Sequence, residues 1–316
     1  MKVAVLKGGI SSEREVSLVS GAAVAKALRD EGFDVVEIDA HPARLERELR
    51  ELAPDVAFNA LHGDWGEDGE VQRILDALRI PYTHSGADAS ALAMNKIATR
   101  DALRAVGIRF SESREVPREV AGRGGVLHAP YVVKPNGQGS SASVHLVMEE
   151  TAEILAAIAA DEGLGAVPMV EAYIPGRELT VTCLDGRAIC VTEIIPRGWY
   201  SYEEKYGEDA ARHELPADIP EDAYSQCMAW AELAHRTLGC SGVSRTDFRY
   251  DDTVDNAHET DMAKRVVTLE LNTQPGMTPT SLAPEQAAWK GMDFGALCRW
   301  MVEDASWPRG EQRGKA

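Results

Sequence analysis

Short apolar runs alternate with amphipathic segments along the first eighty or so residues. Three runs have the length and composition of buried strands: VAVL (3–6), DVVEID (34–39) and DVAFNAL (55–61). Two segments have helical periodicity: residues 12–31, which end before Gly32, and VQRILDALR (71–79). Strands and helices in this order predict a parallel, doubly wound α/β sheet, whose ligands bind beyond the carboxyl ends of its strands.

A polar loop, KGGISSERE (7–15), follows the first predicted strand. Ser12 and Glu15 in this loop fit a capping box at the start of a helix, which gives Glu15 a structural role. Glu13 has no such role. It lies where backbone N–H groups and the helix dipole could help it to hold a ligand amine, although acidic residues are favoured in first helical turns in any case.

A second polar loop, LHGDWGEDGE (61–70), follows the third strand and contains His62. This histidine could be a general base or a ligand contact. A lone histidine is more often a hydrogen-bonded scaffold residue, so both interpretations stay open.

The pattern becomes antiparallel after a helix around residues 89–106, which contains Lys96. PYVVKP (130–135) and SVHLV (143–147) read as two strands joined by the Gly/Ser loop NGQGSSA. Backbone N–H groups of such a loop can close over phosphates, with Lys96 and Lys134 supplying positive charge. The loop is not a Walker loop, because no Gly-Lys-Ser/Thr opens a helix. A hairpin tip without a ligand is the alternative.

Further strands and one long irregular segment follow. GRELTVTCLDGRAICVTEI (176–194) predicts a hairpin that turns at Asp185-Gly186. Glu171 and Glu178 bracket a bend, and could bind an adenine amino group and a ribose hydroxyl unless they are simply exposed strand ends. Residues 196–216 are aromatic and charged without clear periodicity, which predicts a lid over a ligand site. Residues 251–265 predict a polar surface insertion between two strands.

Two apolar-rich runs near the C-terminus, RTDFRYDD (245–252) and RVVTLELNTQPG (265–276), carry the clearest chemistry. Because strand side chains alternate faces, Arg245 shares a face with Asp247, and Glu270 shares a face with Asn272. If the runs pair, these four polar groups converge. Carboxylates with a neutral oxygen suit Mg²⁺, and the arginine could neutralise charge that develops in a reaction. A solvated strand face or a structural ion pair is the simpler alternative.

Composition limits the class of protein. The chain has 316 residues, 44% of them hydrophobic, which suffices for a large core in two or three lobes. A formal net charge of −18 argues against nucleic acid or an anionic membrane as a partner. The five cysteines form no CxxC or Cys/His cluster, and the apolar run at the start is too short for a signal peptide or a membrane span. These features predict a globular cytosolic protein with reduced thiols.

Seven motifs together resemble the D-alanine–D-alanine ligases of the ATP-grasp superfamily. In chain order they are GGISSEREVSLVSG, LHGDWGEDG, YVVKPNGQGSS, VEAYIPGRELTV, YSYEEKY, GVSRTDF and LELNTQPGMTPTSL. The resemblance implies an N-terminal parallel α/β substrate-binding domain followed by a two-subdomain ATP-grasp fold. The corresponding domains are residues 1–92, residues 93–180 with the glycine-rich loop, and residues 181–316 with the lid and metal site.

The resemblance implies ATP held between two antiparallel sheets and two Mg²⁺ ions, with Mn²⁺ as a possible substitute. Adenine would meet Glu171 and the backbone of Ala172 and Ile174, and the ribose would meet Glu178. The matching nucleotide contacts are Lys96, Lys134, Glu171, Ala172, Ile174, Glu178, Lys205 and Leu269. The matching metal ligands are Asp247, Glu270 and Asn272.

The catalytic and substrate positions are implied in the same way. Glu13, Ser140 and Tyr206 match a hydrogen-bonded triad, with Glu13 near the ammonium group of the first D-alanine. Ser281 and Leu282 match the carboxylate pocket of the second D-alanine. The matching catalytic and substrate residues are Glu13, His62, Ser140, Tyr206, Arg245, Gly276, Ser281 and Leu282.

The reaction that the family performs starts with transfer of the ATP γ-phosphoryl group to the first D-alanine. The amine of the second D-alanine then attacks this acyl phosphate. Arg245 and the Gly276 backbone N–H would stabilise the oxyanion, while lid closure would exclude water. The resemblance also implies a role in peptidoglycan synthesis and a homodimer.

Six positions depart from the usual family pattern. Ala142 and Ser143 stand where the glycine loop usually has Val-Gly, His84 replaces a frequent glycine, and Arg73 replaces a glycine after a glutamine. Asn95 precedes the lysine where aspartate is common, and Ala172 replaces a lysine at the adenine edge. Because none belongs to the metal trio or is Arg245, we expect altered affinity with activity retained.

Two other functions are weighed against D-alanine ligation. A depsipeptide ligase would join D-alanine to D-lactate, but Lys205 and Tyr206 argue against it, since such relatives tend to differ there. A module that binds ATP and Mg²⁺ without turnover would not need Arg245 beside the predicted metal ligands.

Overall fold

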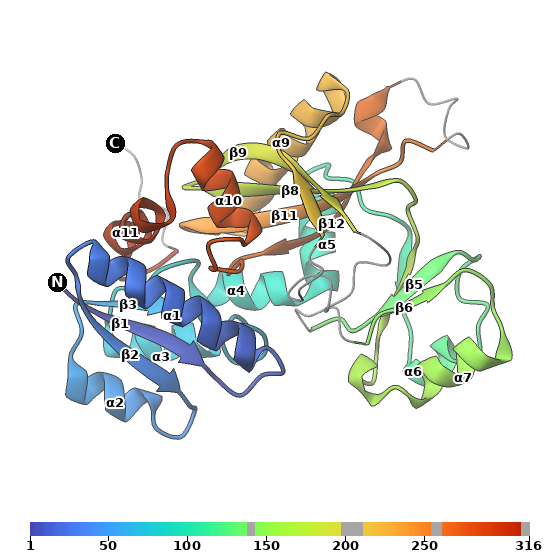
Figure 1. Cartoon of the computed structure of the whole chain (residues 1–316). Coiled ribbons are helices and arrows are strands. Elements are labelled where there is room, and N and C mark those ends of the chain that lie inside the picture. The colour runs from blue at the N-terminus through green and yellow to red at the C-terminus, as the bar shows by residue number, and fades with distance from the viewer. Residues whose placement is uncertain (138–142, 197–210, 254–260, 311–316) are drawn as a thin grey trace.

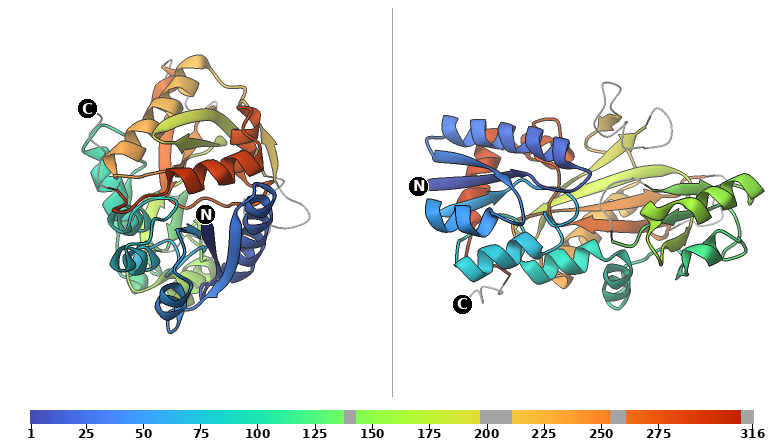
Figure 2. Two further views of the ribbon diagram at one scale, coloured as in Figure 1. Left: turned by 90° about the vertical axis from the view of Figure 1, so that its left-hand side faces the viewer. Right: turned by 90° about the horizontal axis from the view of Figure 1, so that it is seen from below.

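Three β-sheets organise the chain in this computed structural model, which describes residues 1–137, 143–196, 211–253 and 261–310 (Figure 1). In the view from below, the N-terminal sheet and the central sheet lie at opposite ends, with the five-stranded sheet between them (Figure 2). The predicted fold class, a parallel α/β unit followed by two antiparallel sheets, is confirmed. The domain ranges 1–92, 93–180 and 181–316 stay a prediction.

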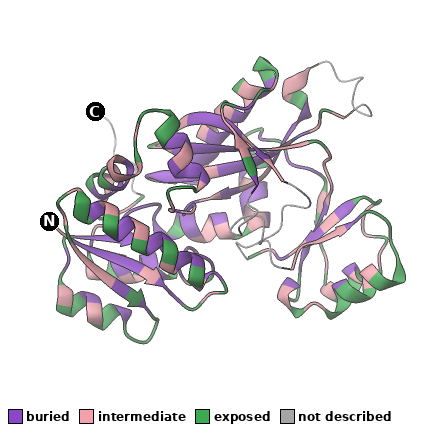
Figure 3. Cartoon of the chain, viewed as in Figure 1, coloured by how far each residue is buried: buried purple, intermediate pink, exposed green. Residues whose placement is uncertain are grey.

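The N-terminal sheet has the order β2-β1-β3, and both strand pairs are parallel. Its strands are β1 (Lys2–Gly8), β2 (Asp34–Ala40) and β3 (Val56–Asn59). Its helices are α1 (Arg14–Asp30), α2 (Leu45–Leu52) and α3 (Glu70–Leu78). Strands β1 and β3 are buried on both faces, whereas the edge strand β2 is only partly buried (Figure 3), which explains the nearly continuous apolar runs of β1 and β3.

The first face of this sheet is covered by residues from both ends of the chain. Val3, Val5 and Phe58 share one core with Leu297 and Met301, which belong to the C-terminal helix α11 (Phe294–Asp304). Helix α11 also packs against α1. The N-terminal core is therefore completed only by the last helix.

The central sheet is antiparallel, with the order β4-β7-β5-β6. Its strands are β4 (Ser113–Glu115), β5 (Tyr131–Lys134), β6 (His145–Val147) and β7 (Met169–Ala172). Helices α6 (Arg118–Ala121) and α7 (Ala152–Ala160) and the 3₁₀ turn η1 (Glu162–Leu164) accompany it. The predicted pairing of β5 with β6 is confirmed.

The five-stranded antiparallel sheet has the order β10-β9-β8-β11-β12. Its strands are β8 (Arg177–Leu184), β9 (Arg187–Ile195), β10 (Arg212–Glu214), β11 (Val243–Tyr250) and β12 (Val266–Asn272). Helices α9 (Glu221–Thr237) and α10 (Leu282–Trp289) and the 3₁₀ turn η3 (Met262–Arg265) pack around it. The predicted turn at Asp185-Gly186 is confirmed, with both residues at positive φ, as a type I′ hairpin requires.

Three local predictions need correction. Helix α1 starts at Arg14 with Glu13 as its N-cap and without a side-chain cap, so the capping box of Ser12 and Glu15 does not form. The hydroxyl of Ser11, the neighbour of Ser12, instead accepts a hydrogen bond from the Glu13 N–H. Strand β10 lies within the segment predicted to be wholly irregular, because it extends the hairpin edge at β9.

The third correction concerns the helix predicted over residues 89–106. The structure divides it into α4 (Ala87–Met94) and α5 (Lys96–Arg104). Asn95 has an extended backbone, and its side chain accepts a hydrogen bond from the Ala98 N–H, which starts a new helix. Asn136 binds the next free N–H groups, those of Lys96 and Ile97. The break places Lys96 at a helix start.

Two of the positions where the family often has glycine adopt left-handed backbone. His84 has φ +66° and Ser143 has φ +57°. This conformation strains most side chains, while histidine and small polar residues tolerate it better than β-branched ones. The usual glycine therefore reflects backbone geometry at both positions.

No helix in the described ranges combines the length and apolarity needed to cross a bilayer. All five cysteines are free thiols: Cys183, Cys190, Cys227, Cys240 and Cys298. Burial raises the pKa of each of these thiols, which keeps them protonated and unreactive.

The Asn95 cap can be tested by thermal unfolding. Asn95→Ala removes the acceptor for the Ala98 N–H and should destabilise the protein by about 1 kcal/mol, lowering the melting temperature by about 2–4 °C. Asn95→Asp keeps the acceptor and should melt close to the unchanged protein. Identical melting of the alanine variant would show that this cap contributes nothing to stability.

Candidate functional site

The two strands that carry the clearest chemistry pair as predicted. The antiparallel register of β11 and β12 places Arg245 opposite Asn272 and Asp247 opposite Glu270. A β-bulge follows Asp247, so Phe248 pairs with Thr268 and the register skips one residue of β12. The four polar side chains therefore share one face of the sheet.

Basic side chains neutralise both carboxylates of this group. The Arg245 guanidinium spans Asp247, with 2.8 Å from Nε to Oδ1 and 2.7 Å from Nη2 to Oδ2. Lys96 Nζ lies 3.1 Å from Glu270 Oε2. Lys96 thus reaches β12 from the start of α5, a placement that the helix break makes possible.

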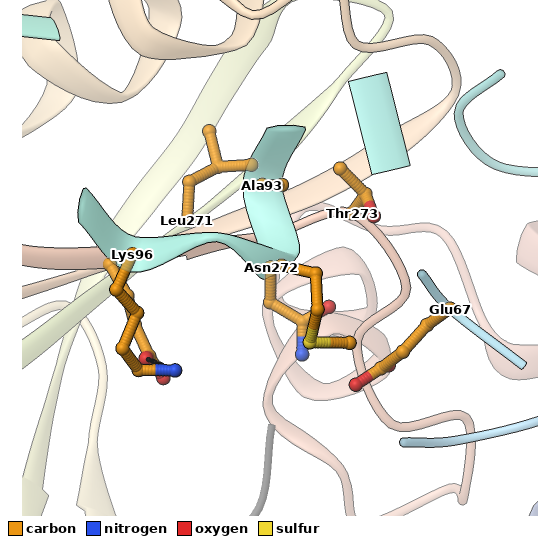
Figure 4. Close-up of a pocket in the computed structure, with 8 residues that line it drawn as sticks. Glu67, Ala93, Lys96, Leu271, Asn272 and Thr273 are labelled. Atoms are coloured by element: carbon orange, nitrogen blue, oxygen red, sulfur yellow. Dashed lines mark ion pairs between the residues drawn. The ribbon is translucent and has the colours of Figure 1, made fainter. Parts of the chain in front are cut away.

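A pocket opens beside the Lys96–Glu270 pair, and its polar side chains come from three parts of the chain. In Figure 4, Lys96, Asn272 and Glu67 direct their polar ends toward the same space, whereas Leu271 points away from it. The lining residues are Glu67, Ala93, Met94, Lys96, Glu270, Leu271, Asn272 and Thr273. The pocket therefore lies between the second N-terminal loop (61–70) and β12, which carries the predicted metal ligands Glu270 and Asn272.

The donor set fits a hard divalent cation. Asp247 and Glu270 offer carboxylate oxygens and Asn272 an amide oxygen, which match the preference of Mg²⁺ for one or two carboxylates. The Asn272 Oδ1 accepts a 2.6 Å hydrogen bond from the Gln274 N–H, which fixes its orientation. Across the described ranges, no three or more His, Cys, Asp or Glu side chains gather as a metal cluster.

A second charged pair lies on the central sheet. Lys134 Nζ is 2.5 Å from Glu171 Oε2, and the Ser111 hydroxyl donates to Glu171 Oε1 at 2.7 Å. Burial opposes the charge on Lys134, but Glu171 and Glu270 outweigh it and raise the pKa of this lysine. Lys134 is therefore a permanent cation within electrostatic reach of the metal strand.

An arginine anchors the segment 173–176, which connects the central sheet to the five-stranded sheet. Arg249 Nε donates to the Ile174 carbonyl at 3.0 Å, and Nη1 lies 3.4 Å from Glu178 Oε2. The same guanidinium lies over the ring of Tyr173, 5.7 Å from its centroid. Arg249 thus holds Ile174 and Glu178, two of the residues predicted to contact adenine and ribose.

The two N-terminal loops touch each other at Glu13. This residue is buried, and a Cβ added to Gly63 would come within 2.9 Å of Glu13 Oε2. Gly63 also has φ +70°, so glycine is required there both by backbone conformation and by close approach. The Ser11 hydroxyl donates to the His62 carbonyl at 2.6 Å and ties the loops together.

His62 is a buried residue with hydrogen-bond partners. Its Nε2 lies 3.3 Å from the Ser20 hydroxyl. Burial and the charge of Arg245 lower the pKa of His62 to about 4, which keeps it neutral at pH 7. These contacts favour the scaffold interpretation of His62, although the effect of Arg245 places it beside the site.

The turn after β12 leads to α10. Ser281 is the N-cap of α10, and Leu282 is its first residue. The Ser281 hydroxyl accepts from the Thr278 N–H at 3.1 Å, and a Cβ on Gly276 would come within 3.0 Å of that hydroxyl. Gly276 therefore lies close to Ser281, and Leu282 follows at the first position of α10, while their roles as substrate contacts stay a prediction. Ser140, Lys205 and Tyr206 lie outside the described residues.

Sequence reasoning missed several residues that support the site. Gln274 is buried, its Oε1 accepts from Asn59 Nδ2 at 3.0 Å, and its Nε2 donates to the Leu61 carbonyl. It thereby joins the second N-terminal loop to the end of β12. The sequence signal for Gln274 was a polar residue in the turn NTQPG, which has apolar residues on both sides. Thr180, Ser111 and Glu67 had no distinguishing signal.

Comparisons with known proteins agree along nearly the whole chain. The family model described as D-ala D-ala ligase C-terminus matches residues 106–303, and the one described as D-ala D-ala ligase N-terminus matches residues 39–85. The D-alanine–D-alanine ligase of Dinoroseobacter shibae is 54% identical over 310 residues, covering 98% of this chain and 96% of the relative. That of Ruegeria pomeroyi is also 54% identical, covering 98% and 97%.

A solved structure shows the same architecture. It is the D-alanine–D-alanine ligase from Bacillus anthracis complexed with ATP, which matches with a TM-score of 0.76 and 28% identity. The match covers 96% of each chain. With relatives above half identity and a family model over most of its length, this chain belongs to the D-alanine–D-alanine ligase family.

Proposed function

We propose that this protein uses ATP to join two D-alanine molecules into D-alanyl-D-alanine, releasing ADP and phosphate. The observation that carries the proposal is the shared face of Arg245, Asp247, Glu270 and Asn272, with Lys96 at its edge. Such a face can hold a phosphate-bound cation and an electrophile beside an arginine. We place this reaction in the cytosol, in a homodimer that supplies peptidoglycan synthesis.

ATP binding is supported by the arrangement of charged groups between the two antiparallel sheets. Lys96 and Lys134 supply two cations for the phosphates, and both now pair with carboxylates that line the same region. The predicted contacts to the base and ribose lie along the segment that connects the two antiparallel sheets. They are Glu171, Glu178 and the backbone of Ala172 and Ile174. Leu269, a further predicted nucleotide contact, lies on β12 next to the predicted metal ligand Glu270.

Asp247, Glu270 and Asn272 would hold Mg²⁺, two ions by the family pattern, or Mn²⁺ in its place. When bound, the metal supplies charge neutralisation at the phosphate oxygens. The contribution of the protein is to fix these three oxygen donors, through strand pairing and the hydrogen bond from Gln274.

The chemistry follows from the charges that the chain places at the reaction centre. The carboxylate of the first D-alanine is a poor electrophile until phosphorylation converts it into an acyl phosphate. Attack by the amine of the second D-alanine then develops an oxyanion, which Arg245 and the Gly276 N–H stabilise. At the start of α10 the Ser281 N–H already donates to the Thr278 carbonyl, so Leu282, the first residue of the helix, would supply an N–H for the carboxylate of the second D-alanine.

Each of the two N-terminal loops carries a buried carboxyl group, Glu13 in the first and Glu67 in the second. Burial, reinforced by the negative charge of Glu13, raises the pKa of the Glu67 carboxyl to about 8. A pKa of about 8 favours the protonated form of the Glu67 carboxyl at pH 7. We expect Glu13 to bind the ammonium of the first D-alanine, as the family pattern implies. A buried carboxyl group with a raised pKa is a frequent feature of active sites.

The function is tested by ADP release with different acceptors. The purified protein is given ATP, Mg²⁺ and D-alanine alone, or D-alanine with D-lactate, with L-alanine and D-serine in separate reactions, between pH 6 and 9. We expect D-alanyl-D-alanine as the main product at every pH. A preference for D-alanyl-D-lactate would identify a depsipeptide ligase, and ATP binding without phosphate release would identify a non-catalytic module.

The role of Arg245 predicts a selective loss of turnover. Arg245→Ala should lower kcat about 10²-fold or more and leave ATP affinity nearly unchanged, because the lost interaction forms mainly in the transition state. Arg187, exposed at the start of β9 in the same sheet, provides the control, and Arg187→Ala should retain full activity. Unchanged kcat in Arg245→Ala would remove Arg245 from the mechanism.

The raised pKa of Glu67 predicts a pH-dependent stability. The ordinary pKa is 4.5, so the native state binds the extra proton and loses stability as the pH rises from about 4.5 to about 8. Glu67→Gln should remove this loss, and its melting temperature relative to the unchanged protein should rise steadily between pH 5 and pH 8. Glu70→Gln, an exposed change on α3, should show no such trend. A constant difference would contradict the raised pKa.

A further inference from the structure

Thr180 on β8 contacts the predicted metal ligand Asp247 from the side opposite to β12. The antiparallel register of β8 and β11 places the two residues directly across from each other. The Thr180 hydroxyl donates to Asp247 Oδ1 at 2.6 Å, a length typical of a charge-assisted hydrogen bond. Thr180 is fully buried and Asp247 is 8% exposed, so little water competes for this bond.

The hydrogen bonds of Asp247 are unequal at its two oxygens. Oδ1 accepts from the Thr180 hydroxyl and from Arg245 Nε. Oδ2 accepts from Arg245 Nη2. Thr180 therefore occupies Oδ1 on the sheet side, and Oδ2 keeps more acceptor capacity for a cation.

A buried glutamine fixes the backbone that carries this hydroxyl. The pairing of β8 with β9 shifts register between Val181 and Cys183, which disturbs the strand ladder beside Thr180. Gln286 of α10 binds there: its Oε1 accepts from the Thr182 N–H at 2.9 Å, and its Nε2 donates to the Thr180 carbonyl at 3.3 Å. Thr180 is also β-branched, which restricts its side-chain rotation.

We propose that Thr180 is a positioning residue for the metal site, whose hydroxyl holds the Asp247 carboxylate so that Oδ2 faces the divalent cation. This inference rests on the proposed role of Asp247 as a metal ligand. Groups that orient a metal ligand typically contribute 10-fold to 100-fold to metal affinity. The first residue of α10 belongs to the predicted acceptor pocket, so one helix supports both the acceptor pocket and the metal ligand.

A neighbouring threonine provides a matched control. Thr182 lies two residues along β8 on the same face, opposite Arg245, and is equally buried. Its hydroxyl has no hydrogen-bond partner among the residues that the structure describes. Replacing either threonine by valine changes the shape very little, and only at Thr180 does the change remove a hydrogen bond to a predicted ligand.

The test is Mn²⁺ binding to the full chain with a saturating non-hydrolysable ATP analogue, followed by the EPR signal of free Mn²⁺. Thr180→Val should weaken Mn²⁺ binding about 10-fold to 100-fold and raise the Mg²⁺ concentration needed for half-maximal activity. Excess Mg²⁺ should restore kcat. Thr180→Ser keeps the hydroxyl and should bind Mn²⁺ like the unchanged protein, as should Thr182→Val.

Asp247→Asn separates the two levels of the proposal. If this variant loses Mn²⁺ binding while Thr180→Val binds normally, Thr180 has no positioning role. If Asp247→Asn also binds normally, the proposed metal role of Asp247 is wrong. Equal weakening in Thr180→Val and Thr180→Ser would assign the effect to packing and overturn the inference. Should Thr180→Val not fold, Thr180→Cys, with a weak thiol donor, replaces it with the same expectation.

Discussion

The register of strand β11 against its two neighbours is the constraint on which the rest of the site depends. Hydrogen bonding to β12 sets Asp247 opposite Glu270, and hydrogen bonding to β8 sets the same residue opposite Thr180. A slip of one residue in either ladder would turn these side chains to the apolar face that packs on α9. The bulge after Asp247 ends this constraint just beyond the site.

Charge compensation is the second organising feature. In a chain with a net charge of −18, three lysine or arginine side chains of the site each face a carboxylate. Such pairs need good geometry to offset the cost of burial, and the Arg245 fork on Asp247 has it. Under the proposed function, phosphate and metal would replace these pairings, so the charges needed for catalysis are already in place.

Much of this arrangement is readable from the sequence because strand periodicity is strict. The alternation of Arg245 with Asp247 and of Glu270 with Asn272 predicts a shared face, and only the pairing itself remained to be observed. Parallel strands in the first eighty residues are predictable for a similar reason, since apolar runs buried on both faces show no alternation.

Elsewhere the outcome depended on contacts that no local pattern reveals. Ser12 and Glu15 satisfy the capping spacing, but the Ser11 hydroxyl bonds to the distant His62 carbonyl and the helix starts later. The helix around Lys96 breaks because Asn136, forty residues away, binds the N–H groups at its new start. The roles of Thr180 and Gln286 likewise depend on a register shift that sequence cannot show.

The shared core between α11 and the first sheet has a consequence for how the protein is made. A ribosome releases Val3 and Phe58 long before Leu297 and Met301, yet these residues pack together. Domains that emerge first usually fold first, but here α1 covers only part of this face, and the part that packs on α11 stays uncovered until that helix has been synthesised. The nascent chain must therefore keep that apolar face from aggregating, whether through a chaperone or through a loosely ordered intermediate, until its final helix arrives.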